Sequence, residues 1–153
     1  DGAGGSTAPT LENTPYDSGT EYEEGYHTAT LTCSGSGTLT VHSSNDQLSY
    51  IRIGNQVTVN GLIATSAISS PVGYFSISLP YVISDRTETS GRFSGSITIY
   101  DQASSNISDF VILGIEGESA ARVYLGDDPS LQSDSANAID AATNIAVSVT
   151  YFV

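Results

Sequence analysis

Alternation of apolar and polar residues along short runs is the feature of this sequence that most restricts its fold. Residues 29–33 alternate Ala, Leu and Cys with Thr, and residues 145–153 alternate Ile, Val and Tyr with Ala, Ser, Thr and Phe. A period of two places apolar side chains on one face of a β-strand and hydroxyls on the other. The sequence predicts about nine short strands, since similar runs occur at 38–41, 48–53, 57–63, 75–79, 93–99, 110–115 and 121–125.

Turn signals separate these runs. Gly54-Asn55 lies between two of them, and a two-residue hairpin is predicted because both residue types tolerate positive φ. Asn60-Gly61 interrupts the following run, and the apolar pair after it shifts the alternation by one position, so we expect a β-bulge. Residues 126–143 are polar and irregular, with one helical turn expected within 136–142.

Each predicted strand has a single apolar face, which another β-layer must cover. We therefore expect residues 26–153 to form an all-β domain, a two-sheet β-sandwich that is jelly-roll-like and has about nine short antiparallel strands. The run at 110–115 is almost entirely apolar, which fits a strand buried on both faces or one at an interface. Together with the C-terminal strand, it favours a buried interface between subunits.

Residues 1–25 have a different composition. Gly, Pro, Ser, Thr and acidic residues dominate there and no period is sustained, which predicts a flexible linker or lead-in arm. The chain begins with Asp and not with Met, so we expect a processed product or a fragment of a longer polypeptide.

The charge balance excludes several classes of partner. The net charge is -13, with four Arg and no Lys, so binding of nucleic acid through a basic surface is excluded. Anionic lipid headgroups are repelled as well, and no apolar stretch approaches the ~18 residues of a spanning helix, so membrane insertion is not expected. The chain instead carries 24 Ser and 16 Thr. Hydroxyl faces suit contact with protein or sugar because they avoid desolvating a charge, although these residues are also simply good β-formers.

The stretch from Leu48 to Tyr81 carries a recognisable pattern. An aromatic residue, a basic residue and Ile-Gly-Asn precede a Val-x-Val strand, a Ser-rich turn with Pro-x-Gly, and a strand that ends in Leu-Pro-Tyr. With TATLTCSGSGTLT upstream and NIAVSVTYFV at the end, residues 26–153 resemble the β-rich C-terminal domains of bacteriophage tail fibres and tailspikes. The resemblance implies a homotrimeric, non-enzymatic cap of an extracellular virion fibre that binds a host cell-surface glycan or holds the trimer in register.

Sugar binding generally needs a flat aromatic ring with polar groups nearby. Trp is absent, but the chain has nine Tyr, several of them at predicted strand ends or beside loops. Each of these rings could equally be a partly buried tyrosine with a satisfied hydroxyl. The candidate carbohydrate-binding residues are Tyr74, Tyr81, Tyr100, Tyr124, Arg86, Arg92, Asp101 and Asn106.

Acidic residues flank the predicted strand at 121–125. Glu116 and Glu118 precede it, and Asp127 and Asp128 follow it. If these ends met neighbouring loops, their oxygens could bind Ca²⁺, and solvated loop charge is the alternative interpretation. Apart from this Ca²⁺, the sequence predicts no cofactor.

No catalytic residue is predicted. The two histidines, His27 and His42, lack a Gly-x-Ser-x-Gly elbow or a similar context, and with Cys33 they do not have zinc-ligand spacing. A structural or surface role is expected for both.

Three functions are consistent with the sequence. The first is a non-catalytic receptor-binding and trimer-capping domain of a phage tail fibre or tailspike that attaches to host-surface carbohydrate. The second is a purely structural module, a capsid decoration or fibre cap without a ligand. The third is a polysaccharide-degrading enzyme, which the lack of a recognisable acid/base constellation disfavours.

Overall fold

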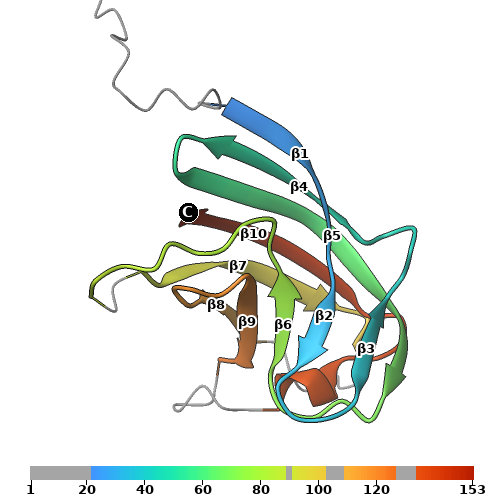
Figure 1. Ribbon diagram of the computed structural model, residues 1–153. Coiled ribbons are helices and arrows are strands. Elements are labelled where there is room, and N and C mark those ends of the chain that lie inside the picture. The colour runs from blue at the N-terminus through green and yellow to red at the C-terminus, as the bar shows by residue number, and fades with distance from the viewer. Residues whose placement is uncertain (1–21, 89–90, 103–108, 127–133) are drawn as a thin grey trace, which may run out of the picture.

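The computed structural model describes residues 22–88, 91–102, 109–126 and 134–153 (Figure 1). The described residues are almost all in strands or the turns between them, so the all-β prediction is confirmed. The strands are β1 Tyr22–Thr28, β2 Leu31–Cys33, β3 Thr38–Val41, β4 Gln47–Ile53, β5 Gln56–Ser69, β6 Phe75–Ser78, β7 Phe93–Tyr100, β8 Phe110–Gly114, β9 Ala120–Leu125 and β10 Asn144–Phe152. The short 3₁₀ helix η1, Ser135–Ala138, overlaps the helical turn expected within 136–142.

The strands form one antiparallel path in the order β1-β4-β5-β10-β7-β8-β9-β6-β2, with β3 paired to β5. Strand β7 is the corner of this path, because Ser96–Tyr100 pair with β10 while Phe93–Gly95 pair with β8. Figure 1 shows the sheet curling into a half-barrel, with β1, β4, β5 and β10 (the β5 half) facing β8, β9, β6 and β2 (the β9 half). The prediction of two separate sheets is not confirmed, since β7 is continuous with both halves.

A single hydrophobic core fills the concave side. In β10 the buried positions alternate with exposed Ser148, Thr150 and Phe152, as the sequence predicts. Fully burying such side chains contributes about 1.5–3 kcal/mol each. The two halves supply inward-facing side chains at Leu48, Val57, Val59, Ile145 and Val149, and at Phe75, Ile77, Ile112, Ala121 and Val123.

The hairpin prediction is confirmed, whereas the bulge prediction is wrong. Gly54 has φ 58, and Ile53 pairs directly with Gln56 across the two-residue turn. Strand β5 pairs with β10 in unbroken register through Gly61, so the alternation does not shift there. Gly61 faces inward, where an added Cβ would lie 2.8 Å from Leu48 Cδ2. The residue is small because β4 approaches closely. The register shift lies instead in the pairing of β3 with β5, where Thr40 pairs with Ala67 and Val41 with Thr65, so that Ser66 of β5 is left over.

The first strand begins earlier than the predicted domain start at residue 26. Strand β1 starts at Tyr22 and pairs with β4 along its whole length. Glu23 and Glu24 therefore lie in a strand, while the rest of the predicted arm, residues 1–21, lies outside the described residues. In the part of the chain that the structure describes, no helix has the length and apolar character needed to cross a bilayer.

Candidate functional site

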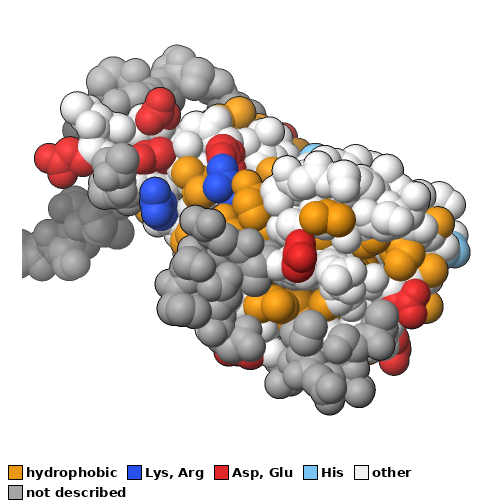
Figure 2. All heavy atoms as spheres, turned by 90° about the horizontal axis from the view of Figure 1, so that it is seen from below, with side chains coloured by type: hydrophobic (Ala, Val, Ile, Leu, Met, Phe, Trp, Pro, Cys, Tyr) orange, Lys and Arg blue, Asp and Glu red, His pale blue; other side chains and the backbone are white. Residues whose placement is uncertain are grey.

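The predicted sugar-binding residues lie in several separate places. Seen from below the view of Figure 1, the surface is mostly neutral polar and apolar, with few charged side chains (Figure 2). Of the eight candidates, Asn106 lies outside the described residues. The other seven fall into four groups: Tyr74 with Tyr124, Arg86 with Arg92, Tyr81 alone, and Tyr100 with Asp101.

Tyr74 and Tyr124 come together beside β9. Their ring centroids are 5.0 Å apart, and the guanidinium carbon of Arg122 lies 5.2 Å from the Tyr74 ring centroid. Arg122 also donates from Nε to Glu118 Oε2 at 3.0 Å and makes a second short contact to Oε1. The bond to Glu118 raises the pKa of Arg122. Because Tyr124 is only 4% exposed, the half-buried Tyr74 is the ring of this pair that a sugar could reach.

The predicted metal ligands do not meet among the described residues. Glu118 is occupied by Arg122, and Glu116 Oε2 accepts a hydrogen bond from the Gly91 backbone N–H at 3.1 Å. Asp127 and Asp128 lie outside the described residues. Within those residues, no three His, Cys, Asp or Glu side chains are grouped so as to hold a metal ion. The Ca²⁺ site stays a prediction.

Tyr81 follows β6 in the chain and contacts two residues of β4. Its ring meets Tyr50 edge-on at 5.6 Å, and the guanidinium carbon of Arg52 is 5.1 Å from its centroid. Tyr50 Oη donates to Glu23 Oε1 at 2.7 Å. Hydrogen bonds from Tyr81 and Tyr50, with the Arg52 charge, lower the pKa of Glu23. The bond to Glu23 in turn raises the pKa of Tyr50, so this hydroxyl is a poor general base at neutral pH.

Arg86 and Arg92 share one shallow hollow. Phe93 and Phe152 also line it, and the guanidinium carbon of Arg86 is 5.4 Å from the Phe152 ring centroid. Both arginines are exposed, and neither makes an ion pair within the described ranges. The hollow therefore brings two predicted residues together beside an aromatic ring.

Tyr100 and Asp101 lie at the end of β7. Tyr100 is 45% exposed. Asp101 Oδ2 accepts from Asn144 Nδ2 at 3.0 Å, and its carbonyl accepts from Thr143 Oγ1 at 3.3 Å. Asp101 thus fixes the start of β10, which is a structural role that its position in the sequence did not indicate.

The two histidines make local contacts. His27 Nε2 lies 2.9 Å from Ser78 Oγ, and burial lowers the pKa of His27. His42 Nδ1 accepts from the Ser44 backbone N–H at 3.2 Å. The His27 contact connects β1 to the end of β6, and the His42 contact closes the turn after β3.

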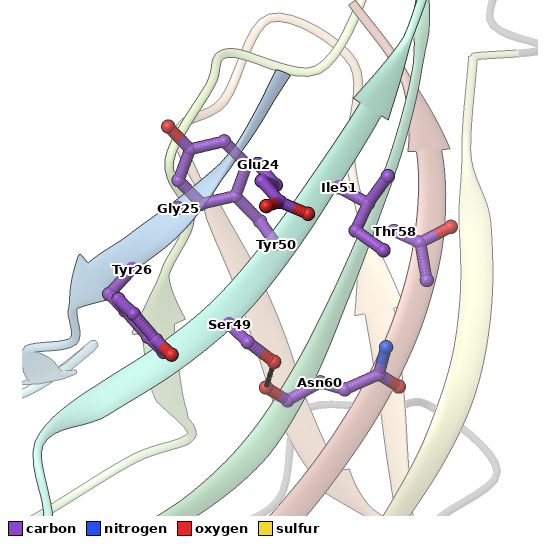
Figure 3. A pocket seen from close by; sticks show the side chains of 8 residues that line it. All are labelled: Glu24, Gly25, Tyr26, Ser49, Tyr50, Ile51, Thr58 and Asn60. Atoms are coloured by element: carbon purple, nitrogen blue, oxygen red, sulfur yellow. Dashed lines mark hydrogen bonds between the residues drawn. The ribbon is translucent and has the colours of Figure 1, made fainter. Parts of the chain in front are cut away.

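Sequence reasoning missed an open depression on the convex side of the β5 half, which we call the outer face. It has a volume of about 340 Å³ and lies across β1, β4 and β5 (Figure 3). Two cross-strand rows build it, because Tyr26 pairs with Ser49 and Ser49 with Asn60, while the neighbouring row holds Glu24, Ile51 and Thr58. Its lining residues are Glu24, Gly25, Tyr26, Ser49, Tyr50, Ile51, Thr58 and Asn60.

The depression was missed because the first four residues of β1, residues 22–25, were assigned to a linker. Alternation at Tyr22, Glu24, Tyr26 and Thr28 continues the β pattern and would have extended the strand. Placing Tyr26 and Asn60 on one face also requires the order β1-β4-β5, in which β4 separates them.

Comparison with known proteins places this fold beside one class of phage protein. No protein-family model matches the chain, and no curated protein matches it. The fold is, however, similar to that of a tailspike. The solved structure is the crystal structure of Dettilon tailspike protein (gp208), with 21% identity and a TM-score of 0.69. The match covers 86% of this chain and 24% of that chain, so the chain spans about a quarter of the tailspike's length. At this identity the likeness shows a shared fold.

Proposed function

We propose that this chain is a non-catalytic receptor-binding and trimer-capping domain of a phage tail fibre or tailspike, which attaches the virion to host-surface carbohydrate. The observation that carries the proposal is the outer face of the β5 half. Most of the exposed large apolar side chains lie there or on the adjoining end of β7, among Ser, Thr, Asn and Gln: Tyr22, Tyr26, Ile51, Ile53, Leu62, Tyr100 and Phe152. The fold shared with a tailspike supports the same reading.

The chemistry of this face suits a sugar. A pyranose ring has apolar C–H faces and a rim of hydroxyls, so it needs flat apolar surface beside neutral donors and acceptors. Tyr26 is 75% exposed and Ser49, Thr58 and Asn60 lie on the same face. Neutral side chains of this kind can be desolvated at lower cost than charged ones.

The homotrimer belongs to the same proposal. Three copies raise the apparent affinity when each site binds weakly, because later contacts are effectively intramolecular. Light scattering on the purified chain should give three times the chain mass of 15.9 kDa. A monomer at high protein concentration would contradict trimer capping.

The contacts at the titratable groups favour a non-catalytic role. Hydrogen bonds from Tyr81 and Tyr50 lower the pKa of Glu23 and stabilise its charged form. A general acid needs the opposite shift.

Binding to an array of bacterial surface polysaccharides tests the function. We expect saturable binding of the labelled protein to at least one polysaccharide, with no change in polymer length after incubation. Failure to bind any of them would favour a purely structural cap. Shortened polymer with new reducing ends would instead show an enzyme.

A further inference from the structure

We propose that the outer-face depression around Ser49 is the carbohydrate subsite, and that it takes a neutral pyranose unit and not an acidic one. This inference rests on the proposed function and specifies its site and ligand class. It assigns binding to residues of β1, β4 and β5 that the sequence did not single out (Figure 3).

The depression has the shape of a shallow sugar site. Tyr26, Ser49 and Asn60 are successive partners across three strands, so Tyr26 and Asn60 are about 10 Å apart along the row. Ser49 Oγ donates to the Asn60 carbonyl at 2.9 Å, which holds this small side chain low against β5. A low floor between a tyrosine and an asparagine leaves room for one ring.

The aromatic wall is fully available. Tyr26 is the most exposed of the large apolar side chains of the described residues, at 75%. Its neighbour Gly25 has no side chain, and an added Cβ there would lie 2.9 Å from Tyr50 Oη. Tyr50 thus packs beneath the strand, and the Tyr26 ring remains on the outer face as a stacking surface.

The opposite row supplies polar groups and one apolar contact. Tyr22 Oη donates to Glu24 Oε2, which fixes this carboxylate on the outer face. The other oxygen, Oε1, has no hydrogen-bond partner in the described part of the chain and can accept from a ligand hydroxyl. Ile51 lies between Glu24 and Thr58, so a C–H face can rest on it.

Charge selects a neutral sugar. Glu24 is the only charged residue that lines the depression, and the chain as a whole has a net charge of -13. A uronate, phosphate or sulfate would meet a carboxylate without a compensating cation. A neutral sugar has hydroxyl donors for Glu24 and both donors and acceptors for the Asn60 amide.

The same charge argues against pairing of this face with itself in a two-fold dimer. The described outer face of β1, β4 and β5 carries no Arg or Lys, so such an interface would bury Glu24 without a cation from either copy. Sugar hydroxyls satisfy that carboxylate directly.

Tyr26→Ala tests the site. On an array of neutral and uronate- or sulfate-bearing polysaccharides, the wild-type protein should bind neutral members only. Tyr26→Ala should weaken that binding by about tenfold or more, because the stacking surface is lost, and Tyr26→Phe should retain most of it. Asn60→Ala should weaken it severalfold. Val82→Ala is the control, since it removes an exposed apolar side chain outside the depression.

The outcomes separate the inference from the function on which it rests. If Tyr26→Ala and Asn60→Ala leave binding to neutral polysaccharides unchanged, the subsite lies elsewhere on the chain, while the proposed function stands. Binding to acidic polysaccharides alone would overturn the ligand class. No binding to any polysaccharide would overturn both proposals. A change of assembly mass in Tyr26→Ala, with an unchanged circular dichroism spectrum, would show that this face is an interface between copies.

Discussion

The ring of Phe93 stacks on the ring of Tyr151, with centroids 5.3 Å apart and 22° between the planes. Phe93 begins β7, the strand that turns the sheet from one half to the other, and Tyr151 is 1% exposed near the end of β10. The stack therefore ties the corner of the curled sheet to the core. On the neighbouring strand, Gly114 leaves the space that the Phe93 ring occupies.

Gly114→Ala should destabilise the domain by about 1–3 kcal/mol, because the new methyl group overlaps the Phe93 ring and must displace it. Urea unfolding measures the change. In a Phe93→Ala background the methyl group enters emptied space, so the same substitution should cost clearly less. If Gly114→Ala lowers the free energy of unfolding equally in the wild type and in the Phe93→Ala background, the Phe93 ring is not the reason that position 114 needs glycine.

Tyr151→Phe isolates the hydroxyl from the stack. The hydroxyl accepts from the Tyr81 backbone N–H and donates to the Tyr81 carbonyl, both at 3.3 Å. Burial raises the pKa of Tyr151 to about 12. Removing the hydroxyl should cost about 1 kcal/mol, since two backbone groups lose a partner, while the stack remains. Tyr151→Ala removes the ring as well and should cost about 3–5 kcal/mol. If Tyr151→Phe costs as much, the hydroxyl and not the stacked ring supplies most of the stabilisation.

The strands were predictable wherever local alternation and turn chemistry agree. The C-terminal strand was predicted because Ile145, Val147 and Val149 must face one core, and the structure buries all three. The Gly54-Asn55 hairpin was predicted because a two-residue turn needs positive φ.

Gly54→Ala tests that turn without any packing change. Gly54 has φ 58, and an added Cβ would meet nothing within 4 Å. The substitution should therefore cost about 1–2 kcal/mol through backbone strain alone, and Gly54→Asn should cost less because Asn tolerates this conformation. Thermal unfolding of the two variants gives the comparison. Equal losses would point to a lost contact and not to backbone conformation.

The wrong bulge prediction and the overlooked depression both depend on which residues are neighbours across strands, which a single sequence does not show. Gly61 looked like a break in alternation, yet it keeps the register and makes room for Leu48 from the neighbouring strand. Glu24 looked like part of an arm, and Glu24 and Tyr26 share a face with Asn60 only because β4 pairs with both β1 and β5. Cross-strand neighbours depend on strand order, and alternation does not encode strand order.

Glu23 should make stability depend on pH in the acidic range. Hydrogen bonds from Tyr81 and Tyr50 lower the pKa of Glu23 from its ordinary value of 4.5. A lowered pKa in the folded state means that this contribution is complete above pH 4.5 and is lost as the pH falls through the folded pKa. Glu23→Gln should therefore unfold at a lower temperature than the wild type at neutral pH, and the gap should narrow in acid. If the difference in unfolding temperature between the wild type and Glu23→Gln is the same at every pH, the charge of Glu23 does not contribute to stability.

Tyr22 should act on glycan binding through Glu24. The Tyr22 hydroxyl donates to Glu24, and this bond raises the pKa of Tyr22. Tyr22→Phe should weaken neutral-glycan binding severalfold, because the carboxylate is no longer held over the depression. In a Glu24→Ala background, Tyr22→Phe should have no further effect. An equal loss in both backgrounds would mean that the Tyr22 ring contacts the sugar itself, which would extend the subsite along β1 beyond Glu24.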